Sequence, residues 1–91
     1  MLTLICYDIV QTKRRTNVMK LLKGYGTRVQ RSVFECDLDA VEFAALRRQL
    51  QALIDRTTDS VRCYRLDAAA VERITIDGVG HVARTPTHWV V

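Results

Sequence analysis

The apolar residues of this chain switch between helix spacing and strand spacing in a fixed order, and that order limits the fold more than any other feature. Two segments have helix spacing. The first follows Thr12, a candidate N-cap, and its apolar positions are Val18, Leu21, Leu22 and Tyr25. The second begins at Asp39, with Glu42 in a capping-box arrangement, and its apolar positions are Phe43, Leu46, Leu50, Leu53 and Ile54.

The segments beside these helices have the composition of strands. Residues 2–7 form a nearly continuous apolar run, typical of a strand that is buried on both faces. Residues 27–38 are rich in β-formers and long enough for two strands that meet in a bend near Arg31, and residues 60–66 alternate as a fourth strand. The order strand, helix, strand, strand, helix, strand predicts a ferredoxin-like α+β fold, with a four-stranded antiparallel sheet and two helices on one face.

The length of 91 residues allows one domain. We assign residues 1–78 to the ferredoxin-like domain and residues 79–91 to a C-terminal tail or arm. The stretch at 74–76 permits one more short strand, and the apolar end at 89–91 favours an arm that pairs with a partner subunit. A frayed tail is the alternative. His81 and His88 lie in this region without a motif, so we predict no catalytic role for either.

Cysteine spacing and hydropathy exclude several classes of protein. Cys6, Cys36 and Cys63 are odd in number and far apart, which predicts small buried strand residues rather than a disulfide framework or a zinc site. The apolar opening is too short for a membrane span and lacks the positive flank of a signal peptide. We therefore expect a cytoplasmic protein with no membrane partner.

Positive charge is concentrated in the first half of the chain. Between Ile9 and Phe34 there is no acidic residue, although the formal net charge of the whole chain is only +4. The bases in this stretch are Lys13, Arg14, Arg15, Lys20, Lys23, Arg28 and Arg31. A soluble face usually intersperses both signs of charge, so this segment predicts a surface that binds DNA or RNA, with an ordinary solvated face as the alternative.

Four segments of the chain resemble the CRISPR-associated Cas2 family. They are Cys6-Tyr7-Asp8-Ile9, Arg14-Arg15, the run of residues 25–36 (Tyr-Gly-Thr-Arg-Val-Gln-Arg-Ser-Val-Phe-Glu-Cys) and the run of residues 59–66 (Asp-Ser-Val-Arg-Cys-Tyr-Arg-Leu). The resemblance covers roughly residues 1 to 66. It implies a homodimer whose sheets face each other, with the segment after the fourth strand crossing to the partner. It also implies a metal-dependent nuclease and a bridge between two dimers of the Cas1 integrase.

Asp8 is the strongest candidate for chemistry, because it ends the first strand and is the only acid in the first 34 residues. From the residues alone, a hydrogen-bonding role in the loop is the more usual one for such an aspartate. The resemblance favours a metal-binding and catalytic role instead. One Asp8 from each chain of a dimer, together with a substrate phosphate, could then hold Mg²⁺.

Other residues are expected to support this site. Arg14 and Arg15 open the first helix near Asp8, where a phosphate would meet backbone amides and guanidinium groups. Tyr7 should point to the opposite face from Asp8 and pack in the core. Ser32 and Phe34 are placed on the sheet face near the dimer axis, with Ser32 donating to a phosphate or to Asp8 and Phe34 packing in the interface.

Three functions follow from these features. The first is a subunit for CRISPR spacer acquisition, which binds nucleic acid as a homodimer and docks the integrase. The second is a magnesium-dependent endonuclease that acts on single-stranded RNA or double-stranded DNA through paired Asp8 residues. The third is a toxin-like ribonuclease of the related VapD type, which would share the fold and act without an integrase.

Overall fold

The computed structural model describes residues 1–82, and its elements follow the predicted order with one addition at the end. They are β1 (Leu2–Asp8), α1 (Thr12–Lys23), β2 (Thr27–Gln30), β3 (Val33–Asp37), α2 (Ala40–Leu53), β4 (Ser60–Leu66) and α3 (Ala68–Glu72).

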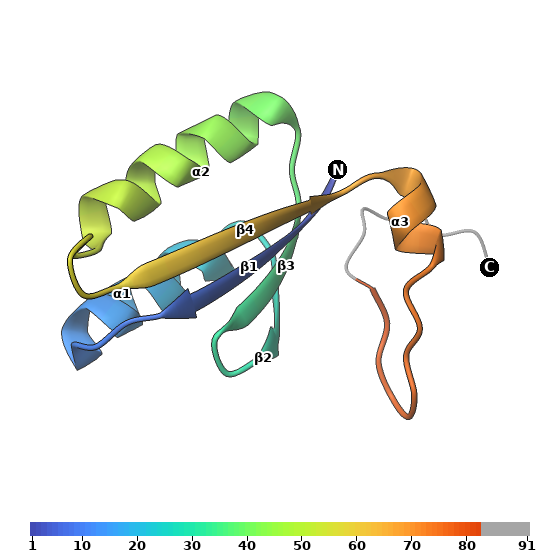
Figure 1. Cartoon of the computed structure of the whole chain (residues 1–91), viewed down its shortest axis with the longest axis horizontal. Coiled ribbons are helices and arrows are strands. Elements are labelled where there is room, and N and C mark those ends of the chain that lie inside the picture. Colours follow the sequence, from blue (N-terminus) through green and yellow to red (C-terminus); the bar gives the residue numbers. More distant parts are fainter. Residues whose placement is uncertain (83–91) are drawn as a thin grey trace.

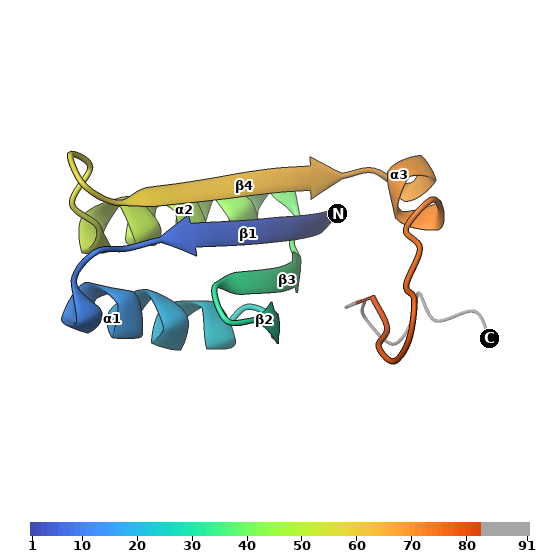
Figure 2. The ribbon, with the colours of Figure 1, turned by 60° about the horizontal axis from the view of Figure 1, so that its bottom comes forward.

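The four strands form one antiparallel sheet in the order β2-β3-β1-β4. β1 lies in the centre, where Ile5 faces Phe34 of β3 on one side and Cys63 of β4 on the other. Both long helices, α1 and α2, cover the same face of the sheet (Figures 1 and 2). The predicted ferredoxin-like fold is confirmed.

Alternating side chains of the strands meet the helices in the core. Ile5, Tyr7, Phe34 and Cys36 contribute from β1 and β3, and the helices contribute Val18, Leu22, Leu46 and Leu50. Burial raises the pKa of the Cys36 thiol to about 11, so it remains protonated at neutral pH. Cys6 and Cys63 are only partly buried, although all three cysteines are free and lie on strands.

The β2–β3 hairpin turns at Arg31 and Ser32, as the sequence predicts. Its register shifts between Arg28 and Gln30, so the bend is accompanied by an irregularity in β2. Gly26, just before β2, passes so close to β3 that a Cβ atom there would lie 2.8 Å from the Cα of Cys36. A side chain at position 26 would therefore push the hairpin away from the sheet.

The two helix starts differ in how they are capped. At α2 the predicted capping box is present: Asp39 accepts a hydrogen bond from the amide of Glu42 at 2.7 Å, and Glu42 accepts one from the amide of Asp39 at 3.0 Å. At α1 the N-cap is Gln11 rather than Thr12, and its side chain makes no capping bond. The Thr12 hydroxyl instead accepts a bond from Arg15, at 3.0 Å.

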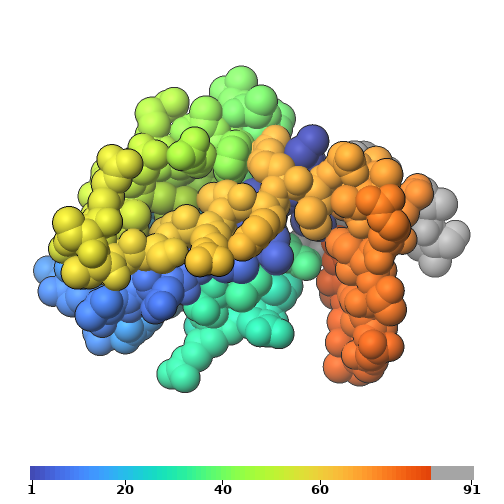
Figure 3. Space-filling view, in the orientation of Figure 1, coloured from blue at the N-terminus to red at the C-terminus, as the bar shows by residue number. Residues whose placement is uncertain are grey.

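The region after β4 differs from the prediction. Residues 68–72 form the short helix α3, whose N-cap Asp67 accepts a bond from the amide of Ala70 at 2.8 Å, and residues 74–76 form no strand. Consecutive alanines favour a helix, whereas a strand at 74–76 would need a neighbour to pair with. Residues 74–82 stand apart from the sheet and its two helices (Figures 1 and 3). Most of the predicted arm at 79–91, including His88, lies outside the described residues, so its role stays a prediction.

None of the helices in the described part of the chain is long and apolar enough to cross a lipid bilayer.

Candidate functional site

An open cleft of about 440 Å³ lies where β1 ends, between the start of α1 and the β2–β3 hairpin. Its polar lining brings together Asp8, Arg15, Arg28, Arg31 and Ser32. The sequence analysis singled out all five of these residues, which come from three separate segments of the chain. The cleft is therefore the place where a carboxylate and three of the predicted cationic residues meet.

Asp8 is exposed at the end of β1, and its neighbours are fixed on both sides. Tyr7 and Ile9 are buried in the core, and β4 pairs with β1 as far as Ser60 opposite Asp8. The Tyr7 hydroxyl donates to the Arg31 carbonyl at 3.3 Å, which ties the strand end to the hairpin. Because the residues on both sides of Asp8 are packed in the core, the backbone at Asp8 is held in place while its carboxylate is exposed to solvent.

Two arginines of the cleft are held in place by backbone carbonyl groups. Arg15 donates from Nη1 to the Ile9 carbonyl at 2.9 Å. Arg28 donates from Nε and Nη2 to the Arg31 carbonyl at 3.1 and 2.6 Å. A guanidinium group has five N–H donors, so each keeps donors free for a phosphate. Their positions are set before any ligand arrives.

The remaining predicted cations lie elsewhere. Lys13, Lys20 and Lys23 are exposed on α1 and do not line the cleft. Arg14 also lies outside it, because its guanidinium turns toward the start of β4 and donates from Nε to Asp59 at 2.8 Å. Arg14 is therefore engaged in an ion pair that the sequence analysis did not foresee.

Asp59 links three segments around the end of β1. Its side chain is 0 % exposed, and besides Arg14 it accepts bonds from the amide of Val10 at 3.1 Å and from the amide of Asp55 at 2.9 Å. The hydrogen bond from Arg14, supported by the two amides, holds the pKa of Asp59 well below its usual range. Asp59 thus fixes the loop that follows Asp8, yet nothing local in the sequence marks it for this role.

Replacing Asp59 with asparagine should lower the melting temperature at pH 7 by roughly 5–10 °C, since it breaks a shielded hydrogen-bond network. An acid whose pKa is lowered by folding stabilises the fold above its unfolded pKa of about 3.9, and that contribution is lost as the pH falls toward the folded value. Thermal unfolding followed by circular dichroism should therefore show a steeper loss of stability below about pH 4 in the parent chain than in Asp59→Asn. Asp77→Asn, an exposed control, should behave like the parent, and a parent-like Asp59→Asn would contradict the assignment.

The oxygen atoms that line the cleft can be compared with the ligands that a magnesium ion requires. Asp8 is the one carboxylate among the residues that line the cleft, where Ser32 and Thr16 add hydroxyl oxygens. Within residues 1–82, no three His, Cys, Asp or Glu side chains lie close enough together to hold an ion. Mg²⁺ is usually held by one or two carboxylates, with water and phosphate oxygens completing its shell. The exposed Asp8 and the hydroxyl groups of Ser32 and Thr16 are oxygen ligands of the type that suits Mg²⁺, but the lining of the cleft contains a single carboxylate.

The sheet face opposite the helices carries several apolar side chains, together with Glu35 and Arg62, which pair with Leu4 and Cys6 of β1. Side chains alternate along each strand, so the strand residues that alternate with the core-facing residues Ile5, Phe34 and Cys63 point to this face. They include Leu4 and Cys6 on β1, Val33 on β3, and Tyr64 and Leu66 on β4. Tyr64 is 45 % exposed and pairs with Leu4. This face offers an apolar surface that one chain alone leaves open to water.

Phe34 does not lie on that face, which corrects the prediction for it. It is 0 % exposed in the single chain and packs beneath the helices, with its ring 6.4 Å from that of Tyr7. It pairs with Ile5 and shares the face of that core residue, whereas the neighbouring Val33 points outward. Ser32 lines the cleft, and no hydrogen bond joins it to Asp8 in the described structure.

Comparisons with known proteins give one consistent result. The family model described as CRISPR associated protein Cas2 matches residues 1–74. CRISPR-associated endoribonuclease Cas2 3 of Chloroflexus aurantiacus is 57 % identical over 91 residues, which is 100 % of this chain and 98 % of the relative. The crystal structure of Streptococcus pyogenes Cas2 has a TM-score of 0.75 at 38 % identity, covering 86 % of this chain and 100 % of its own. A chain in the structure of a partial Cas6-RT-Cas1–Cas2 complex has a TM-score of 0.78 at 26 % identity, covering 99 % and 98 %.

Proposed function

Because this chain belongs to the family of CRISPR-associated protein Cas2, we propose that it serves in CRISPR spacer acquisition as a homodimer that binds nucleic acid and bridges the Cas1 integrase. We further propose that the dimer is a magnesium-dependent endonuclease. The observation that carries both ideas is the cleft in which the exposed Asp8 lies beside Arg15, Arg28 and Arg31.

The charge of the cleft supports the binding of nucleic acid. Three arginines and one aspartate line the cleft, and the exposed Lys13, Lys20 and Lys23 extend the positive surface along α1. Phosphate groups along a nucleic-acid backbone are the natural ligands of such a surface, since guanidinium forks bind them in bidentate fashion. Contacts to phosphate groups carry no sequence information, so we expect this surface to bind nucleic acids without base specificity.

The open sheet face supports the homodimer. Two copies that pack Leu4, Val33 and Tyr64 against their equivalents would bury the apolar surface that one chain exposes. A two-fold axis through this face could also bring the two Asp8 side chains toward each other, because both lie at the ends of central strands. A pair of carboxylates is what the single chain lacks for a metal site.

In the proposed cleavage reaction, each residue of the cleft has a separate task. The paired Asp8 carboxylates would hold the ion, while Arg28 and Arg31 bind the phosphates on either side of the reacting one. Arg15, fixed by the Ile9 carbonyl, would neutralise charge that develops on the phosphate oxygens. A bound magnesium ion supplies the activation of water for attack on phosphorus.

The integrase is proposed as the partner because the neighbouring structure with a TM-score of 0.78 is part of an assembly that contains Cas1. The endonuclease proposal is supported by the name of the relative from Chloroflexus aurantiacus. The VapD-type alternative has no comparable support, since the family model and the relatives named above are Cas2 proteins.

The binding proposal predicts how affinity depends on salt. Replacing Arg28 and Arg31 together with glutamine should reduce the slope of log affinity against log salt by about 2 for duplex DNA, since each lost phosphate contact removes about 0.9. Fluorescence anisotropy with a labelled duplex at several salt concentrations measures this slope. A matched control is the double variant Arg48→Gln, Arg73→Gln, which removes the same charge from exposed positions outside the cleft. Equal slopes for the two variants would overturn the assignment.

A further inference from the structure

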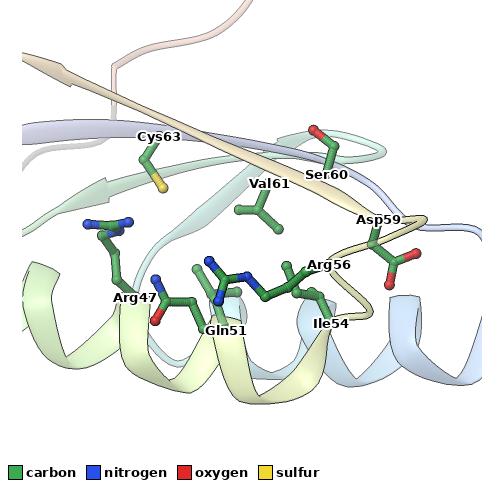
Figure 4. A pocket seen from close by; sticks show the side chains of 9 residues that line it. Arg47, Gln51, Ile54, Arg56, Asp59, Ser60, Val61 and Cys63 are labelled. Carbon is green, nitrogen blue, oxygen red and sulfur yellow. The ribbon is translucent and has the colours of Figure 1, made fainter.

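A second groove, of about 300 Å³, lies between α2 and β4, the edge strand farthest from the hairpin. Figure 4 shows this groove from close by, with α2 along one wall and β4 along the other. It shares no lining residue with the Asp8 cleft. Nothing in the proposed function uses it.

Two guanidinium groups reach into this groove. Arg47 comes from the middle of α2 and Arg56 from the turn before β4, and Figure 4 shows both side chains extending into the space between helix and strand. Gln51 and Ser60 add neutral polar groups between them. The floor is apolar and consists of Leu50, Ile54, Val61 and Cys63.

The positive charge of the groove is not neutralised within the described structure. Neither Arg47 nor Arg56 forms an ion pair there, and Arg47 only lies near the Phe43 ring, with its guanidinium carbon 6.0 Å from the ring centroid. Asp59 is the one acid in the lining, and its carboxylate already accepts hydrogen bonds from Arg14 and from the amides of Val10 and Asp55. In Figure 4 that carboxylate points away from the groove. Two cations therefore share a groove without a counter-charge.

One further arginine continues the positive surface on this side of the molecule. Arg65 lies on the helix side of β4, with its guanidinium carbon 4.4 Å from the centroid of the Phe43 ring of α2. Arg62 alternates with the floor residues Val61 and Cys63 and so points to the other face of the sheet. Arg47, Arg56 and Arg65 therefore lie on one side of the molecule, and the two acids between residues 47 and 65, Asp55 and Asp59, are occupied by local hydrogen bonds. A row of cations fits a polyanion with regularly spaced charges better than a single small anion.

We propose that the groove between α2 and β4 is a second nucleic-acid backbone site, in which Arg47 and Arg56 bind phosphodiester groups. This inference rests on the proposed function, because it adds a second binding surface for the same ligand, nucleic acid. Each guanidinium fork would hold two non-bridging oxygens of one phosphate, with Gln51 and Ser60 donating between them. The dimer would then engage nucleic acid at its outer sheet edges as well as at the Asp8 clefts.

The test compares salt-dependent binding of a labelled DNA duplex by the parent and three double variants. We expect Arg47→Gln with Arg56→Gln to lower the salt slope by about 2 and the affinity at low salt by about tenfold. The control Arg48→Gln with Arg73→Gln should change both quantities much less. Thermal melts followed by circular dichroism, recorded for the parent and for each variant, verify that the variants are folded. If the groove variant matches this control while Arg28→Gln with Arg31→Gln lowers the slope, the groove assignment alone is overturned. A parent that shows no salt-dependent binding would overturn the proposed function as well.

A second measurement identifies the ligand chemistry. The side-chain Nε–Hε resonances of Arg47 and Arg56 should shift when a single-stranded phosphodiester oligonucleotide is added. The same sequence with an uncharged methylphosphonate backbone should leave them unchanged. Equal shifts with both oligonucleotides, or a stronger response to an acidic peptide, would show that the groove does not recognise phosphodiester groups.

Discussion

Replacing Asp8 with alanine is expected to lower magnesium-dependent cleavage by at least about 100-fold, because the metal contributes several kcal/mol to stabilising the transition state. Asp8 is the one carboxylate in the lining of the cleft, so no neighbouring side chain can replace it. The measurement is the rate of cleavage of single-stranded RNA and of duplex DNA by the purified protein, with and without Mg²⁺.

The control for this change is Asp77→Ala, which removes an exposed carboxylate from the segment beyond α3 and should cleave like the parent. Spacer acquisition with the cognate integrase should be assayed on the same variants. If Asp8→Ala loses cleavage but keeps spacer acquisition, the role in acquisition does not need the endonuclease activity. Undiminished cleavage by Asp8→Ala would contradict the catalytic assignment.

Replacing Phe34 with alanine should cost about 3–5 kcal/mol in the free energy of unfolding, because it leaves a cavity under both helices. A chain of 91 residues has a total stability of roughly 5–14 kcal/mol, so this one change removes a large share of it. Urea denaturation at a fixed protein concentration measures the loss. The same concentration is needed for every variant because a dimer is stabilised by mass action.

Tyr64→Ala is the matched control for Phe34→Ala, since both remove an aromatic ring from the sheet, but Tyr64 lies on the open face. We expect it to change the stability of the monomer by less than about 1 kcal/mol and to weaken dimerisation. If Phe34→Ala weakened dimerisation with little loss of monomer stability, Phe34 would be an interface residue after all.

The secondary structure could be predicted because its signals are local. Helix spacing in α1 and α2, the capping box of Asp39 and Glu42, and the alternation in β4 are each contained within a short segment. It was harder to predict which face of each strand packs against the helices. The run of residues 2–7 is apolar on both sides, so its pattern does not show which side meets the helices, and the placement of Phe34 was wrong for a related reason.

The cleft was predicted in part. Arg15 and Ser32 lie in the cleft with Asp8, as expected. Arg28 and Arg31 were predicted only as part of the positive surface, and they line the same cleft because the ends of β1 and of the hairpin come together in this topology. The bond from Arg14 to Asp59 joins residues that are 45 positions apart, and such a pairing has no local signal. The groove between α2 and β4 arises in the same way, from side chains of two elements that become neighbours only in the fold.

Binding of Mn²⁺, as a substitute for Mg²⁺, tests the central claim most directly when calorimetry is combined with light scattering on the same sample. We expect a dimer that binds one ion per two chains, and a dimeric Asp8→Ala variant that binds none. A monomer at working concentrations, or ion binding of equal strength in Asp8→Ala, would contradict the claim that two copies of Asp8 together form the metal site.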